Sequence, residues 1–143
     1  MLTIRQALKY VNTKHASQTD KLGVPYIWHL IRVARKLKHK NEKLLALLHD
    51  VIEDTDTNIE EIKALGVCDE IIEALGLLTH KENVPYEEYI RNISTNPLAK
   101  AVKLADLSDN SNAERLEKLP LEIQTKLKNK YDIAFSILKA KSQ

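Results

Sequence analysis

Apolar residues recur along most of this chain at the three- and four-residue intervals of amphipathic helices, while the alternation typical of half-buried strands is scarce. Only three Gly and four Pro residues interrupt the pattern. Residues that commonly cap or open helices precede the apolar stretches. These predicted starts are Thr3, Pro25, Asn41, Thr57 or Asn58, Asp69, Pro85, Asn96-Pro97 and Pro120. We therefore predict an all-α fold of eight or nine helices, with a polar loop over residues 17–24.

Length and composition narrow the class of protein. At 143 residues, with 43% hydrophobic and 29% charged residues, the chain suits one compact globular domain over residues 1–143. The formal net charge is only +2 and Lys and Glu are interspersed, which argues against binding to nucleic acid. No apolar run is long enough to cross a bilayer, the N-terminus lacks a signal-peptide core, and the single cysteine, Cys68, excludes an internal disulfide. We expect a cytoplasmic protein without membrane contact; its oligomeric state does not follow from these features.

Residues 44–55, LLALLHDVIEDT, place polar groups in a helix that is otherwise apolar on nearly every face. Glu53 follows His49 by four residues and Asp54 follows Asp50 by four, so one continuous helix would gather all four groups on one surface. Burying carboxylates costs several kcal/mol unless they are paired or bound to a cation. A divalent cation would satisfy this cluster. The alternative is a histidine that is hydrogen-bonded in the core, followed by an acidic, solvated helix end.

Two further residues extend the possible metal site. Asp106 lies on a second apolar helix, in AVKLADLSDN, with Asn110 one turn later on the same face. His29 lies among apolar residues in PYIWHLIRVARKL, where a lone histidine is more often part of the core. With His49 and Asp50, they make a set of two imidazoles and two carboxylates, which suits Mn²⁺, Fe²⁺ or Zn²⁺.

The order His29, His49-Asp50, Asp106 resembles the H…HD…D pattern of the HD-domain metal-dependent phosphohydrolases. The surrounding segments HASQTDKLGVPYIWH, LLHDVIEDT and VKLADLSDN narrow the resemblance to the hydrolase domain of RelA/SpoT-type alarmone enzymes and to small stand-alone bacterial HD proteins. The similarity covers residues 15–110 and continues loosely in KYDIAFSIL, so it includes most of the chain. It implies a helical HD-domain fold and no synthetase domain.

The resemblance also implies roles for individual residues. The metal, commonly Mn²⁺, would be held by His29, His49, Asp50 and Asp106. Glu53 and Asp54 would activate the attacking water and protonate the leaving group, with the division of roles between them left open. On the nucleotide side we expect Lys21, Tyr26 and Asn110.

Two departures from the family pattern concern the substrate. Asp20 replaces an arginine that packs against guanine in alarmone hydrolases, and Ser111-Asn112-Ala113 replaces the usual Met-Arg-Thr. A carboxylate can neither stack on a base nor attract phosphate. Lys103 could offset phosphate charge at the rim of the cleft, or be an ordinary surface charge, and His15 could support the loop after it.

Three hypotheses for function follow. The leading one is a metal-dependent enzyme acting on a small nucleotide, with guanosine-3′,5′-bis(diphosphate) as substrate and loss of its 3′-diphosphate as the reaction. The second is an HD phosphohydrolase acting on another nucleotide or phosphorylated metabolite, which Asp20 favours. The third is a non-catalytic HD module that binds metal or nucleotide, against which the retained Glu53-Asp54 pair argues.

Overall fold

The computed structural model describes residues 2–140, and these confirm the predicted all-α class. They form ten helices and no strand, apart from an isolated bridge between Thr19 and Pro25. The helices are α1 (Ile4–Lys14), α2 (Ile27–Arg35), α3 (Lys40–Leu48), α4 (Val51–Asp54), α5 (Ile59–Ala64), α6 (Asp69–Leu78), α7 (Tyr86–Ser94), α8 (Pro97–Asn110), α9 (Ala113–Leu116) and α10 (Leu121–Lys139). The helix α4 and the helix α9 have four residues each, which accounts for the difference from the expected eight or nine.

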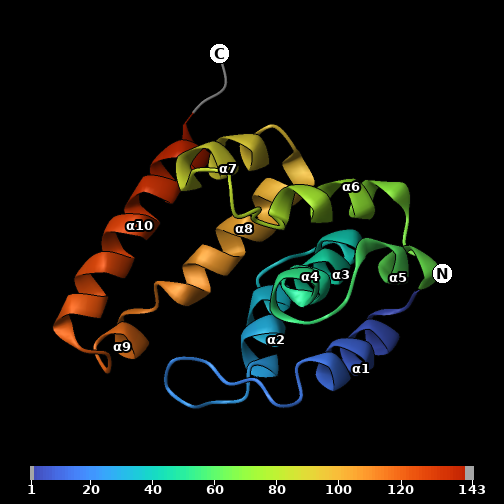
Figure 1. Cartoon of the computed structure of the whole chain (residues 1–143), viewed down its shortest axis with the longest axis horizontal. Coiled ribbons are helices and arrows are strands. Elements are labelled where there is room, and N and C mark those ends of the chain that lie inside the picture. Colours follow the sequence, from blue (N-terminus) through green and yellow to red (C-terminus); the bar gives the residue numbers. More distant parts are fainter. Residues whose placement is uncertain (1, 141–143) are drawn as a thin grey trace.

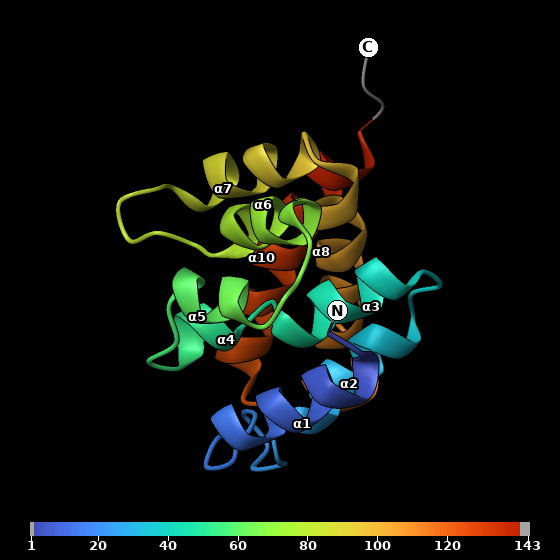
Figure 2. The ribbon, with the colours of Figure 1, turned by 90° about the vertical axis from the view of Figure 1, so that its right-hand side faces the viewer.

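Two helices organise the core. The helix α8 contacts α2, α3, α6, α7 and α10, and α3 contacts α1, α2, α6 and α8. In Figure 1, α8 crosses the middle of the molecule between the long α10 on one side and the α1–α3 region on the other. Figure 2 shows α6 and α7 above α1 and α2, with α3 between these pairs. Five consecutive residues of α3, from Leu44 to Leu48, are buried, as expected for a helix that is apolar on nearly every face. A side chain at the end of α3 or on the inner face of α8 therefore enters the centre of the fold.

Local capping explains several helix starts. The side chains of Thr3, Asn58 and Asn96 accept backbone N–H groups at the starts of α1, α5 and α8, as the sequence indicated. The predicted cap of α3 at Asn41 is wrong. That helix begins two residues earlier than such a cap implies, after His39, whose backbone N–H donates to the carboxylate of Glu42 at 3.1 Å. None of the described helices is long and apolar enough to cross a membrane.

The continuous helix predicted through the His49-Asp50 pair is wrong. The helix α3 ends at Leu48 and α4 begins at Val51, so the pair lies in a turn between them. Asp50 has φ −104° and ψ −2°, away from regular helical geometry. The regular helical spacing from His49-Asp50 to Glu53-Asp54 is therefore interrupted, although the N–H of Asp54 still donates to the backbone oxygen of Asp50 at 3.0 Å.

Candidate metal centre and substrate pocket

Three separate segments bring the four predicted metal ligands together. His29 comes from α2, His49 and Asp50 from the turn after α3, and Asp106 from α8. One ligand atom from each of these residues lies within 4.8 Å of the others. The Nε2 atoms of His29 and His49 lie 2.8 and 3.2 Å from the same oxygen of Asp106, and the His49 Nε2 lies 3.1 Å from Asp50. Both imidazoles and Asp106 are buried.

The donor atoms of this cluster fit a divalent cation. The Nδ1 of His49 faces the backbone oxygen of Ala46 at 2.5 Å, and the Nδ1 of His29 faces a carboxylate oxygen of Asp109 at 2.6 Å. In each ring Nδ1 therefore has an acceptor for its proton, while Nε2 faces Asp106 and, in His49, also Asp50. This is the usual arrangement of histidines that bind metal ions. Two nitrogens and two carboxylates then converge on one point, as a borderline divalent ion requires.

Charges inside the cluster are strongly coupled. Burial disfavours the charged form of every member. It is outweighed at His49 by Asp50 and Asp106, which raise the pKa of this imidazole well above its usual value. It is outweighed at Asp106 by Lys103 and His49, which hold the pKa of this carboxyl well below its usual value. The two acids are therefore ionised, and a positive charge between them is favoured.

Asp109 is a member of the site that the sequence interpretation missed. It is buried, and its carboxylate accepts from His29 Nδ1 and from Arg32 Nε at 2.8 Å, with Arg115 Nη2 at 3.1 Å. Burial opposes the charge, but the hydrogen bonds from His29 and Arg32 hold its pKa below the usual range. Its position in the sequence gave a signal, since an acid three residues after Asp106 lies on the same buried side of a helix.

Two of the residues predicted to contact substrate hold the carboxylates of the cluster. The hydroxyl of Tyr26 donates to Asp50, and the side-chain amide of Asn110 donates to Asp106 at 3.3 Å. Burial, then the neighbouring charge of Asp50, raises the pKa of Tyr26, so this phenol stays protonated as a donor. Both residues also line a pocket beside the cluster, so they connect the metal centre with the space available to substrate.

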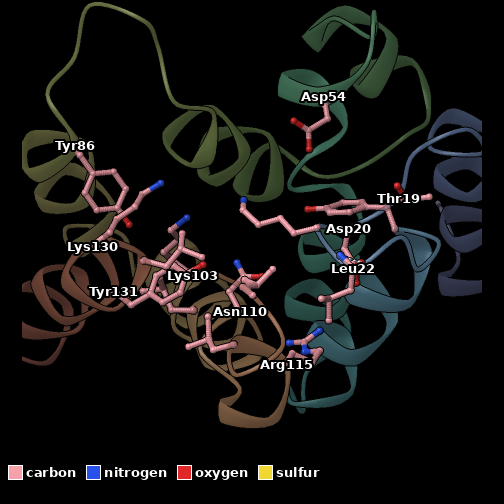
Figure 3. A pocket seen from close by; sticks show the side chains of 16 residues that line it. Thr19, Asp20, Leu22, Asp54, Tyr86, Lys103, Asn110, Arg115, Lys130 and Tyr131 are labelled. Carbon is pink, nitrogen blue, oxygen red and sulfur yellow. Dashed lines mark hydrogen bonds between the residues drawn. The ribbon is translucent and has the colours of Figure 1, made fainter. Parts of the chain in front are cut away.

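The pocket has a volume of about 450 Å³ and is built from both halves of the chain. Figure 3 shows Thr19, Asp20 and Leu22 on one side, Tyr86, Lys130 and Tyr131 on the other, and Asp54 and Arg115 at opposite ends. Lys21, Tyr26, Lys103 and Asn110 also line it. Four leucines, from α8, α9, the loop between α9 and α10, and α10, complete the wall: Leu107, Leu116, Leu119 and Leu127. The pocket therefore combines basic, aromatic and aliphatic surfaces.

Lys103 is a mostly buried member of this wall, with 14% of its side chain exposed, so its interpretation as an ordinary surface charge is wrong. Its ammonium group lies 3.2 Å from Asp106 and 5.4 Å from the centre of the Tyr89 ring. Burial opposes the charged form, but the negative charge of Asp106 raises the pKa of Lys103 above its usual value. The ammonium therefore remains charged beside the metal cluster.

Lys130 contributes a second cation that the sequence interpretation missed. It comes from α10, and its ammonium lies 4.8 Å from the centre of the Tyr86 ring. Among the described residues, neither Lys130 nor Lys21 forms an ion pair. Burial, then repulsion by Lys103 and Lys21, lowers the pKa of Lys130. These three lysines thus face one pocket with more positive charge than the carboxylate of Asp106 neutralises.

The Glu53-Asp54 pair separates in the structure. Asp54 lines the pocket, and burial, followed by repulsion from Asp50 and Glu53, raises its pKa to about 6. The carboxylate of Glu53 instead accepts the backbone N–H of His80. Consecutive residues of a helix point about 100° apart, so these two neighbouring acids of α4 face different surroundings. Asp54 is therefore the acid with direct access to the pocket.

Asp20, which replaces the expected arginine, closes the loop before α2. One of its carboxylate oxygens accepts the N–H of Leu22 at 2.8 Å and that of Val24 at 3.0 Å. Between them, Gly23 has φ +82°, a conformation that favours glycine. His15 supports the start of this loop: it is buried, and its Nδ1 lies 2.7 Å from Gln18 Oε1. Asp20 thus has a structural role in addition to lining the pocket.

Comparisons with known proteins agree with these motifs. No family model matches the chain. It is 35% identical over 118 residues to a guanosine-3′,5′-bis(diphosphate) 3′-pyrophosphohydrolase of Aquifex aeolicus, covering 75% of this chain and 17% of that protein. It is 34% identical over 113 residues to the zebrafish enzyme of the same name, MESH1, covering 71% of this chain and 63% of that protein. The chain therefore spans less than two thirds of these relatives.

A solved structure extends the likeness to the fold. The structure of a metazoan SpoT orthologue that hydrolyses ppGpp matches with a TM-score of 0.80 and 25% sequence identity, over 96% of this chain and 85% of that one. The family resemblance inferred from the three motifs is thereby confirmed. In sequence and in fold, the chain is a homologue of the HD-type (p)ppGpp 3′-pyrophosphohydrolases.

Proposed function

We propose that this chain is a metal-dependent phosphohydrolase that removes the 3′-diphosphate of guanosine-3′,5′-bis(diphosphate) or of a closely similar nucleotide. One observation carries the proposal: Tyr26, Lys103 and Asn110 bond to the carboxylates of the possible metal centre and also line the 450 Å³ pocket. The centre and the pocket are therefore parts of one site. The homologous enzymes act on this nucleotide, as their names state.

His29, His49, Asp50 and Asp106 would hold the metal ion. We propose Mn²⁺ for a mixed set of two nitrogens and two oxygens, with Fe²⁺ and Zn²⁺ as alternatives. When bound, such an ion polarises a phosphoryl oxygen and lowers the pKa of water. The four-residue set leaves open positions for water and substrate.

The remaining residues of the site would act on the substrate directly. Asp54 is ionised above its pKa of about 6, so at neutral pH its carboxylate accepts a proton from the attacking water. Lys103, Lys21 and Lys130 offset the charge of the phosphates. Tyr86, Tyr131 and the leucines offer flat and apolar surfaces for the nucleoside. In the overall reaction, water attacks phosphorus, the bond to the 3′ oxygen breaks, and this oxygen leaves with a proton.

The second candidate is hydrolysis of another phosphorylated nucleotide, and Asp20 favours it. Its carboxylate lies at the pocket wall and repels an anionic ligand. A binding-only module is less favoured, because Asp54 lines the pocket with its pKa raised to about 6, which suits a group that transfers protons near neutral pH.

A substrate panel tests these alternatives. Protein loaded with Mn²⁺ is incubated with ppGpp, pppGpp, NADPH and nucleoside mono-, di- and triphosphates, and the products are identified by ion-exchange chromatography. The proposal expects release of diphosphate from ppGpp and its loss in Asp106→Ala. Turnover of another nucleotide but not of ppGpp would support the second candidate. No turnover of any compound by metal-loaded protein would refute the proposed enzyme.

A further inference from the structure

Asp109 joins one metal ligand to the wall of the pocket. Its carboxylate oxygens meet His29 Nδ1 at 2.6 Å, Arg32 Nε at 2.8 Å and Arg115 Nη2 at 3.1 Å. Arg115 also donates to the backbone oxygen of Asp109. The aspartate itself is 4% exposed, and its partners come from α2 and α9. Three elements of the fold therefore meet at this one side chain.

We propose that Asp109 is a positioning residue of the metal centre, which fixes His29 with its proton on Nδ1 and its Nε2 free to bind the ion. This inference rests on the proposed metal-dependent function. Histidine can bind a metal through only one nitrogen when the other carries a proton, and the partner of that proton sets which nitrogen it is. At 2.6 Å, Asp109 is placed to accept from Nδ1, while Nε2 is directed at Asp106.

Charge balance argues against a purely structural ion pair. Arg32 and Arg115 already bring two positive charges to one carboxylate. Asp109 therefore does not need an imidazolium as a counter-ion, and its bond to His29 gives direction rather than neutralisation. Without this acceptor, the Nδ1 proton of a ring that is 4% exposed would be buried without a partner.

The contact of Asp109 with Arg115 also links His29 to the substrate pocket. Arg115 lines the substrate pocket, whereas Arg32 does not. A phosphate that attracts the Arg115 side chain acts on the same carboxylate that holds His29. The position of the metal ligand is thus linked to the pocket through two bonds, His29–Asp109 and Asp109–Arg115.

The decisive experiment measures metal affinity separately from activity. Chelator-treated wild type, Asp109→Asn and Arg32→Gln are titrated with Mn²⁺ at fixed pH, and free Mn²⁺ is followed by electron paramagnetic resonance. Circular dichroism sets a temperature at which each protein is folded. Asp109→Asn should bind Mn²⁺ about 10- to 100-fold more weakly than wild type, the range found for outer partners of metal-binding histidines. Arg32→Gln removes another partner of Asp109 but leaves the contact between Asp109 and His29. Its Mn²⁺ affinity should stay within about threefold of wild type, because Arg32 donates to Asp109 and not to the His29 ring.

A second measurement does not depend on whether the variant folds. Wild type with ¹⁵N-labelled histidine is loaded with Zn²⁺, and nitrogen–proton correlation spectra identify the protonated nitrogen of His29. A proton on Nδ1 supports the proposal, and a proton on Nε2 overturns it. Equal Mn²⁺ affinity of Asp109→Asn and wild type also overturns it, as does equal weakening by Arg32→Gln. Wild type that takes up none of Mn²⁺, Fe²⁺ and Zn²⁺ would instead refute the proposed function itself.

Discussion

Asp54→Asn should lower activity and at the same time stabilise the metal-free protein. The carboxylate of Asp54 has a pKa of about 6 because burial and the charges of Asp50 and Glu53 disfavour ionisation. At neutral pH it is therefore mostly ionised and can accept a proton. Removing a general base of this kind costs about 100-fold or more in turnover, or about 2.7 kcal/mol. The metal content should stay near that of the wild type, because Asp54 is not one of the four clustered ligands.

The gain in stability has a defined sign and pH range. Ionising an acid whose pKa rises from its usual 3.8 to about 6 on folding opposes the folded state. This shift corresponds to about 3 kcal/mol at full strength. Because the Asp54 side chain is exposed to solvent on one side, screening reduces the expected effect to about 1 kcal/mol. The penalty is present above pH 6, declines as the pH falls toward 3.8 and is absent below it.

Two assays check both effects. Thermal unfolding of metal-free protein should give Asp54→Asn a melting temperature about 3 °C above that of wild type at pH 7, with the difference shrinking below pH 6. Steady-state kinetics at saturating metal should show that kcat/KM of the wild type decreases as the pH falls through about 6. Asp54→Asn should lack this decrease. Asp56→Asn is the matched control, since the Asp56 side chain is 97% exposed and should change neither quantity. A variant of Asp54 that is less stable and equally active would refute this reasoning.

Three further results are expected. Asp106→Ala should lose both bound metal, measured by mass spectrometry of the purified protein, and activity, whereas wild type should hold about one ion per chain. Lys130→Ala should raise KM for ppGpp several-fold, and more at low salt, while Lys128→Ala on the same helix lines another cavity and should have no effect. Asp20→Asn should lower KM for ppGpp, because the amide oxygen can keep the loop hydrogen bonds while the repelling charge is removed. If KM is unchanged in both Lys130→Ala and Asp20→Asn, the assigned pocket is contradicted.

The sequence predicted most of the fold because local signals and tertiary packing agree. Helical spacing of apolar residues and caps such as Asn58 and Asn96 predicted the starts of several helices correctly. The break at His49-Asp50 escaped this reasoning. The surrounding leucines and valine favour a continuous helix, and the turn is explained by long-range contacts of His49 and Asp50 with Asp106 and Tyr26.

The metal-ligand cluster could be predicted from the sequence, whereas the pocket wall formed by α10 could not. Buried His and Asp residues conflict with an apolar environment, and that conflict is visible in the sequence. The residues of α10 carry no such conflict. Tyr131 and Lys130 are ordinary residues of an amphipathic helix, and only the packing of α10 against α7 and α8 brings them to the pocket. Asp54 and Glu53 could not be told apart, because their difference comes from residues distant in the sequence: Glu53 accepts the N–H of His80, whereas Asp54 lines the pocket.

The pocket also changes the meaning of Asp20. The resemblance expects an arginine at this position, so the sequence alone indicates a loss of positive charge at the nucleotide. Across the cavity, however, Lys130 adds a cation without a carboxylate partner among residues 2–140, and Lys21 next to Asp20 has none either. The pocket therefore keeps positive charge on α10, beside the ring of Tyr86, although the loop lacks the expected arginine. Such a site still attracts phosphate, but it lacks the arginine whose planar guanidinium would stack on the base. Selectivity should thus differ from that of the homologous hydrolases at the base more than at the phosphates.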